Sequence, residues 1–171
     1  QLYLGGSSPQ AGMSGRGRSG AAGRKGHSIE ELRGMTVNDP RNVQAWLALA
    51  NAQRQSRDYA GAATAYDKAL RLDDRNADAW ADYADALASA GNRRLAGAPA
   101  QAIARVLRLD GKHPKALWLQ ASLALEQHRY ADALKRWQSL LAALPAGSPD
   151  ISIVEANIAE ARQLAAQAGG G

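Results

Sequence analysis

Few residues in this 171-residue sequence belong to the types that carry out catalysis or bind metals. There is no cysteine, and the three histidines, His27, His113 and His128, lie far apart along the chain. His113 and His128 fall at turns beside predicted helices, so we expect both at the surface, where they could approach each other without forming a site. Enzymes need several polar groups that converge, such as a nucleophile with its base or two carboxylates in a dry cleft. The HExxH, nucleophile-elbow, P-loop and EF-hand spacings are all missing. The sequence therefore predicts a protein that is not an enzyme and that has no metal ion and no cofactor.

One glycine motif matches a nucleotide-binding signature. The run from Gly15 to Gly20 has the GxGxxG spacing, but residues 5–26 are rich in Gly, Ser and Arg and have no apolar periodicity. That fingerprint binds pyrophosphate only between a strand and a helix, and this composition forms neither, so we expect no nucleotide site here. We expect a flexible linker over residues 1–27 instead. Arginine–glycine segments can also contact nucleic acid, but this one lacks interleaved aromatic residues, so we expect no nucleic-acid partner.

The net charge of +5 is concentrated in the predicted linker. Residues 1–27 hold four basic and no acidic residues, so residues 28–171 hold 17 basic against 16 acidic residues. No stretch approaches the roughly 18 apolar residues of a membrane span. The chain begins at Gln1, and its apolar residues 2–4 give way abruptly to Gly and Ser. We expect a membrane-anchoring hydrophobic segment to precede Gln1 in a longer protein.

Asp78, Asp82 and Asp85 form an acidic cluster. Spacings of four and three residues place all three on one face of a helix. One interpretation is an ordinary solvated face. The other is a negative patch that binds a basic or amide-rich peptide.

Internal repeats set the frame for these residues. Trp46 and Trp80 begin similar segments 34 residues apart, and a third copy begins near Pro114. The run Arg-Leu-Asp recurs after 37 residues, at Arg71 and Arg108, which indicates a three-residue insertion in the second copy. This period is typical of tetratricopeptide (TPR) repeats, each a pair of antiparallel helices. We predict an all-α TPR superhelix over residues 38–168, with repeats at about 43–76, 77–113 and 114–147.

Capping residues and helix breakers define the expected helices. Asn42 and Asn76 can cap helix starts, Pro114 suits a first turn, and Gly91 and Gly111 can end helices. The predicted helices cover residues 42–55, 58–71, 76–90, 99–109, 114–127 and 130–143, and residues 28–37 are a marginal helical segment. Small residues should let the paired helices approach closely, Ala50 with Ala62 and Ala121 with Ala133.

A last helix is expected over residues 150–167. Its apolar stripe comprises Ile151, Val154, Ile158, Ala161 and Ala165. Repeat arrays expose an apolar face at each end, so this helix is predicted to cap the array. An amphipathic helix that itself binds a partner is the alternative.

The TPR pattern implies where a partner binds, because the first helix of each repeat lines the inner, concave wall. The predicted groove residues are Gln44, Leu47, Asn51, Arg54 and Gln55 in repeat one, Asp78, Ala81, Asp85, Ala88 and Ser89 in repeat two, and Lys115, Trp118, Ser122, Leu125 and Glu126 in repeat three. Asn51 and Arg54 match part of the set by which some TPR cochaperones clamp a free carboxylate. Repeat two has acids where that set has bases, which favours an amphipathic helix as the ligand.

The four tryptophans separate into two groups. Trp46, Trp80 and Trp137 occupy interhelical packing positions and are predicted to be core residues. Trp118 comes one place after such a position, so its indole could face the groove as a large apolar anchor with a polar N–H. Burial in the core is the alternative for Trp118.

Particular runs carry a more specific resemblance. They are residues 82–88, the insertion at 94–99, the run from His113 to Leu119, and the segments 130–138 and 158–162. Over about residues 38–165 the chain resembles the periplasmic TPR domain of the CcmI (CycH) family of cytochrome c biogenesis proteins, with TPR proteins of nitrite-reductase maturation as close relatives.

The resemblance implies a chaperone module in the bacterial periplasm, tethered to the inner membrane. Such a module would bind the C-terminal helix of apocytochrome c and work with the other components of cytochrome c maturation that ligate haem. A TPR scaffold that assembles another envelope complex is the alternative function.

Overall fold

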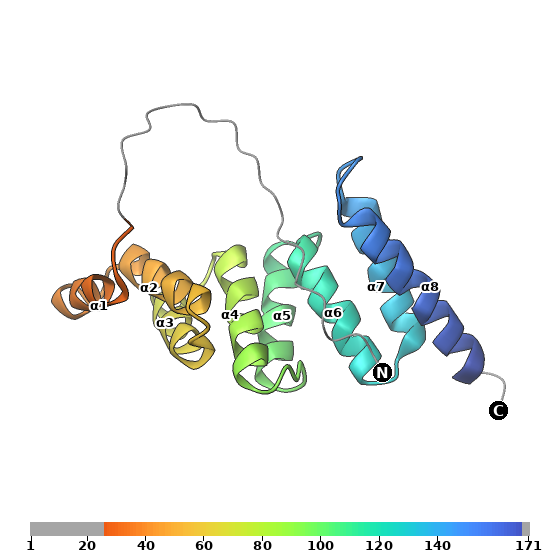
Figure 1. The fold of residues 1–171 in the computed structure, drawn as a ribbon, viewed down its shortest axis with the longest axis horizontal. Coiled ribbons are helices and arrows are strands. Elements are labelled where there is room, and N and C mark those ends of the chain that lie inside the picture. Colours follow the sequence, from red (N-terminus) through yellow and green to blue (C-terminus); the bar gives the residue numbers. More distant parts are fainter. Residues whose placement is uncertain (1–25, 169–171) are drawn as a thin grey trace.

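The computed structural model describes residues 26–168, and every regular element in that range is an α-helix (Figure 1). The helices are α1 (Ile29–Asn38), α2 (Val43–Gln55), α3 (Tyr59–Leu72), α4 (Ala77–Ala90), α5 (Ala98–Leu109), α6 (Pro114–Glu126), α7 (Tyr130–Ala143) and α8 (Ile151–Ala168). The predicted all-α fold is confirmed. The predicted linker and its glycine motif lie outside the described residues, apart from Gly26 and His27.

The helices form an elongated array in chain order (Figure 1). Helices α2 and α3, α4 and α5, and α6 and α7 pack as the three expected pairs, and α8 packs on α7. The turns within the pairs lie along the lower edge of the array in Figure 1, and the turns between successive pairs lie along the upper edge. Each repeat therefore presents its first helix in the same way.

Small and large side chains alternate in the core of each pair, as the repeat pattern predicts. Ala50, Ala62, Ala121 and Ala133 are completely buried, which confirms the two close contacts between paired helices. One large side chain in each second helix fills the remaining space. These side chains, Tyr66, Ile103 and Trp137, are each 1% exposed.

The helix starts follow their capping residues. The side chain of Asn42 accepts a hydrogen bond from the Ala45 amide at 3.0 Å, and Asn76 accepts one from the Ala79 amide at 2.9 Å. These bonds satisfy amides that have no partner within the helix. Pro114 opens α6 and Gly91 closes α4, as predicted.

Helix α1 is better formed than the sequence analysis predicted. It runs for 10 residues and begins with a capping box, in which the Ser28 side chain accepts from the Glu31 amide and the Glu31 side chain accepts from the Ser28 amide. Leu32 is 4% exposed against the core. The Ser-x-x-Glu signal and one buried leucine make this segment a helix that packs on α2.

The insertion in repeat two ties that repeat to the next one. Leu95 packs with Leu119 and Leu123 of α6, and its amide donates to the Glu126 carboxylate at 2.8 Å. Glu126, which was predicted to line the groove, is exposed but already holds a partner. Its carboxylate holds the insertion, an arrangement that a standard 34-residue repeat does not contain.

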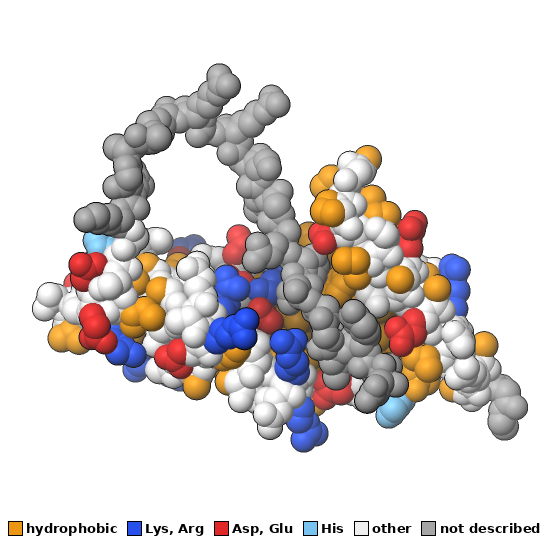
Figure 2. All heavy atoms as spheres, viewed as in Figure 1, with side chains coloured by type: hydrophobic (Ala, Val, Ile, Leu, Met, Phe, Trp, Pro, Cys, Tyr) orange, Lys and Arg blue, Asp and Glu red, His pale blue; other side chains and the backbone are white. Residues whose placement is uncertain are grey.

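Helix α8 covers the end of the array. Val154, Ile158 and Ala161 are buried, and Ile151 and Ala165 are partly buried. Ile153 is 50% exposed, and hydrophobic side chains are prominent over α8 in Figure 2, whereas Lys and Arg side chains gather around α4. No helix within residues 26–168 combines the length and the apolar character needed to cross a bilayer.

The core tryptophans differ in their burial. Trp137 is 1% exposed, as predicted, whereas Trp46 and Trp80 are only partly buried. The indole N–H groups of Trp46 and Trp80 donate to the carbonyl oxygens of Pro40 (2.9 Å) and Asp74 (2.8 Å). These two residues fasten the turn that precedes each first helix.

Candidate functional site

The candidate site is the face shared by the first helices α2, α4 and α6, which we call the first-helix face. The residues predicted there are Gln44, Leu47, Asn51 and Arg54 on α2, Asp78, Ala81 and Asp85 on α4, and Lys115, Trp118, Ser122 and Leu125 on α6. Gln44 and Asp78 are exposed, and the others are partly buried except Ala81. Ala81 is 1% exposed and packs with Val106 of α5 and Ala116 of α6. Ala81 is therefore part of a helix interface and cannot contact a ligand, which corrects its prediction.

A buried tyrosine organises the polar part of this face. The Tyr66 hydroxyl, reaching from α3, lies 2.8 Å from Asn51 Oδ1 and 3.4 Å from Asp82 Oδ2. Burial raises the pKa of Tyr66 above its ordinary value, and the Asp82 carboxylate raises it further. The phenol therefore stays protonated and donates to its neighbours on α2 and α4.

Lys115 neutralises most of the acidic cluster. Its Nζ atom lies 2.6 Å from Asp82 Oδ1 and 3.2 Å from Asp85 Oδ2, and all three side chains are less than 30% exposed. Asp82 and Asp85 are therefore paired and partly buried, whereas the Asp78 side chain is 85% exposed. With Lys115, Asp82 and Asp85 form a partly buried link between α4 and α6.

Arg54 adds a second cation near the same carboxylates. Burial lowers the pKa of the Arg54 guanidinium, but Asp82, Tyr66 and Asp85 together outweigh this effect and raise it. The guanidinium therefore remains charged. Its Nε atom is buried and has no hydrogen-bond partner among the described residues. Arg54 thus retains a donor next to Asp82 and Asp85.

His113 and Asp78 form a further contact between repeats two and three. His113 Nε2 lies 2.9 Å from Asp78 Oδ1, and the Ala116 amide donates to His113 Nδ1 at 3.3 Å. His113 is 8% exposed, so it is not the surface histidine that the sequence predicted. It caps α6, whereas His128 follows the other end of that helix. Since α6 has 13 residues, about 20 Å separates its two ends, so the two histidines cannot approach each other.

The α6 part of the face is aromatic and apolar. The Trp118 ring packs edge-on against the Trp137 ring of α7, with their centroids 4.6 Å apart. Trp118 and Leu125 are partly buried against the core that contains Trp137. Trp118 is thus supported from behind by the core and retains exposed surface.

These residues give the first-helix face two chemical halves. Tyr66, Asn51, Arg54 and the aspartates can hydrogen-bond polar groups, and Trp118 with Leu125 can take an apolar side chain. Sequence reasoning missed Tyr66 and His113. A buried tyrosine hydroxyl needs a polar partner, and this requirement was the only signal for Tyr66.

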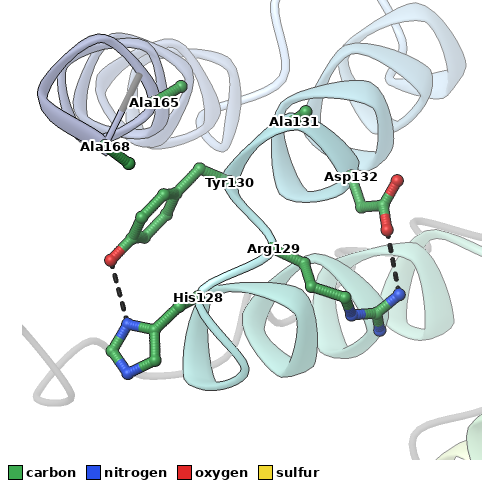
Figure 3. A pocket seen from close by; sticks show the side chains of 7 residues that line it. All are labelled: His128, Arg129, Tyr130, Ala131, Asp132, Ala165 and Ala168. Carbon is green, nitrogen blue, oxygen red and sulfur yellow. Dashed lines mark hydrogen bonds and ion pairs between the residues drawn. The ribbon is translucent and has the colours of Figure 1, made fainter. Parts of the chain in front are cut away.

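A hollow at the other end of α6 has less chemistry. His128, Tyr130, Ala165 and Ala168 line it, together with residues at the start of α7 (Figure 3). Its polar groups pair with one another, because His128 Nδ1 lies 2.9 Å from the Tyr130 hydroxyl and Arg129 pairs with Asp132. Among the described residues no three acidic or histidine side chains come together as a metal site would require.

The amino-acid sequence matches the model of a known protein family. The model of the cytochrome c-type biogenesis protein H TPR domain matches residues 31–151, which run from the first turn of α1 to the first residue of α8. The chain belongs to this family. The match covers the three helix pairs, so the first-helix face lies entirely within the family domain.

Characterised relatives of this TPR family are similar over the same region. The chain is 30% identical over 135 residues to the cytochrome c-type biogenesis protein CcmH of Escherichia coli (strain K12), a match that covers 77% of this chain and 38% of CcmH. It is 28% identical over 147 residues to CycH of Pseudomonas aeruginosa, covering 84% of this chain and 36% of CycH. The chain thus spans less than two fifths of these relatives.

A shorter relative and two solved structures extend the comparison. The formate-dependent nitrite reductase complex subunit NrfG of Escherichia coli O157:H7 is 31% identical over 113 residues, covering 66% of this chain and 57% of NrfG. A crystal structure of MamA matches with a TM-score of 0.70 at 17% identity, covering 81% of this chain and 72% of MamA. The Arabidopsis OM64 TPR domain matches with a TM-score of 0.59 at 18% identity, covering 71% and 94%. The two structures establish the TPR fold alone.

Proposed function

We propose that this domain is a peptide-binding chaperone module of cytochrome c maturation. It holds the C-terminal helix of an apocytochrome c while other components of the maturation machinery ligate haem. The module itself supplies no catalytic group and no cofactor. The family match and the names of its relatives, which are cytochrome c-type biogenesis proteins, support this role.

One observation about the first-helix face carries the proposal. A polar cluster around Tyr66 lies on the same face as an aromatic anchor, Trp118, which the core supports from behind. An amphipathic helix presents the same combination of an apolar stripe and flanking polar side chains. The apolar stripe would pack on Trp118 and Leu125, and polar side chains of the ligand would meet Asn51 and Arg54.

The proposed setting follows from the proposed client. Apocytochromes c receive haem outside the bacterial inner membrane, so the domain works in the periplasm. A segment beyond this chain tethers it to the inner membrane. Its partners are the apocytochrome helix and the haem-ligation components, and nucleic acid is not among them.

A peptide titration tests the proposal. The domain is titrated into fluorescently labelled peptides, and binding is followed by anisotropy. The peptides have the sequences of the C-terminal helices of the host's c-type cytochromes. A scrambled peptide of the same composition is the control. We expect saturable binding of the native helix only. Equal binding of both peptides, or none, would reject the cytochrome client and leave a TPR scaffold for another envelope complex.

Two variants connect that binding to the first-helix face. Trp118→Ala removes the proposed anchor, and Ile153→Ala removes an exposed hydrophobic side chain on α8, outside the face. Binding of the native peptide should weaken with Trp118→Ala and stay unchanged with Ile153→Ala. Equal weakening by both variants would place the peptide elsewhere.

A further inference from the structure

A cleft lies on the opposite side of α4 from the first-helix face. It is lined by Asp67 of α3, by Trp80 and Tyr83 of α4, and by Gln101, Arg105 and Arg108 of α5. We call it the α3–α5 cleft. At about 100° per residue, Trp80 and Tyr83 lie on one side of α4 while Asp78, Asp82 and Asp85 lie on the other. A ligand in this cleft and one on the first-helix face would therefore not compete for space.

The floor of the cleft is a fixed aromatic pair. Trp80 and Tyr83 meet edge to face with their ring centroids 5.8 Å apart, and both are partly exposed. The bond from the Trp80 indole to the Asp74 carbonyl fixes its orientation. Because rigid, partly exposed Trp and Tyr side chains lose little entropy on contact, they dominate many protein interfaces.

The charge of the cleft is set by arginines on α5. Arg105 pairs with Asp74 at 2.6 Å, and Asp67 pairs with Arg71 of the same helix at 2.7 Å. Arg108 is exposed and has no ion pair among residues 26–168. The carboxylates at the cleft therefore already have partners, which leaves the Arg108 guanidinium able to bind an acidic group. A guanidinium beside aromatic rings suits a carboxylate next to an apolar side chain.

We propose that the α3–α5 cleft is a second protein-docking surface, which takes an acidic peptide segment carrying an apolar side chain. The apolar side chain rests on Trp80 and Tyr83, and neighbouring carboxylates bind Arg108 and approach Arg105. Gln101 can hydrogen-bond the backbone of the segment. This surface does not depend on the identity of the first-helix ligand, and it allows the domain to hold two proteins at once.

Indole resonances allow the two surfaces to be followed separately. In ¹H–¹⁵N spectra of the full chain, each of the four tryptophans contributes one indole N–H signal. The probe is a ten-residue peptide with Glu and Asp around one Leu, and its amide counterpart with Gln and Asn is the control. The acidic peptide should shift the Trp80 signal in a saturable manner and leave the Trp118 signal in place. The amide peptide should shift neither.

Two charge reversals complete the test. Arg108→Glu should weaken binding of the acidic peptide at least fivefold, while Arg136→Glu, at an exposed arginine on second helix α7, should change it less than twofold. Thermal melts check that both variants fold. Equal losses in both variants, an unshifted Trp80 signal, or equally tight binding of a thymidine oligonucleotide would overturn the proposal. The cytochrome helix proposed for the first-helix face would shift the Trp118 signal and not the Trp80 signal, so either proposal can fail without the other.

Discussion

Repeats one and three have helices of the same lengths, 13 and 14 residues, and differ in the large core side chain behind the first-helix face. The large side chain in the second helix is Tyr66 in repeat one and Trp137 in repeat three, and each is 1% exposed. The Tyr66 hydroxyl reaches Asn51 and Asp82 and organises a polar cluster. The Trp137 indole has a buried N–H that finds no hydrogen-bond partner within residues 26–168, and its ring supports Trp118 by edge-on contact. The large core side chain thus supports a polar cluster in repeat one and an aromatic surface in repeat three.

The largest effect is expected from removing the aromatic support in repeat three. Trp137→Ala deletes a fully buried ring, and such truncations cost about 3–5 kcal/mol in the free energy of unfolding. Urea denaturation followed by circular dichroism measures this loss. Leu72→Ala, at a 40% exposed position of α3, is the control and should cost far less. Comparable losses would mean that repeat three is not held by this ring.

The next largest effect concerns the ligand. Trp118→Ala should weaken binding of the cytochrome helix by about 1–3 kcal/mol, as truncation of an interface anchor does. Loss of the edge-on contact with Trp137 should also lower the free energy of unfolding by about 1 kcal/mol. Binding is measured by peptide anisotropy below the melting temperature of the variant. A variant that loses stability but binds normally would make Trp118 a core residue only.

The sequence predicted the features that depend on side-chain size and period. The 34-residue spacing of large and small residues predicted the three helix pairs and the close contact of Ala50 with Ala62, because such packing is local within each pair. Helix α1 was underestimated because its strength comes from a capping box and one buried leucine, Leu32, and not from a long apolar stripe.

The polar contacts of the site were less predictable. Tyr66, Asp82 and Lys115 come from three different helices, and their meeting depends on how the repeats stack. Ala81 and Glu126 were placed on the face by analogy with a regular repeat. In the structure Ala81 packs against α5 and α6, and Glu126 binds the insertion, two consequences of the geometry between repeats.

Removing the Tyr66 hydroxyl should affect the polar half of the face. Tyr66→Phe keeps the ring but leaves Asn51 and Asp82 without its hydrogen bond, which should cost about 1 kcal/mol in the free energy of unfolding. Tyr59→Phe, at a partly exposed position of the same helix, is the control and should cost less. If both cost the same, the Tyr66 hydroxyl does not stabilise the cluster.

The same hydroxyl predicts a dependence on alkaline pH. Burial raises the pKa of Tyr66, and Asp82 adds to the increase, so the folded protein keeps the phenol proton when the unfolded chain has lost it. The stabilisation is complete below the ordinary tyrosine pKa of about 10 and decreases as the pH rises above it. Urea midpoints between pH 9 and 11 should therefore fall more steeply for the wild type than for Tyr66→Phe. Burial also raises the pKa of Tyr83, which both proteins retain, so only the difference between them reports on Tyr66.

The smallest effects concern the turns that follow the first helices, and we expect them to be equal in repeats one and three. Arg57 and His128 end the first helices of repeats one and three with φ angles of 65° and 57°, in the left-handed region where a Cβ atom is unfavourable. Arg57→Gly and His128→Gly should each raise the free energy of unfolding by up to about 1 kcal/mol. Arg57→Ala and His128→Ala keep the Cβ atom and should bring no gain.

Equal gains from both glycine variants in urea denaturation would show that the turns are equivalent even though the faces above them differ. A gain in only one repeat would show that the two backbones are not equivalent and that the contrast between Tyr66 and Trp137 is not the whole difference.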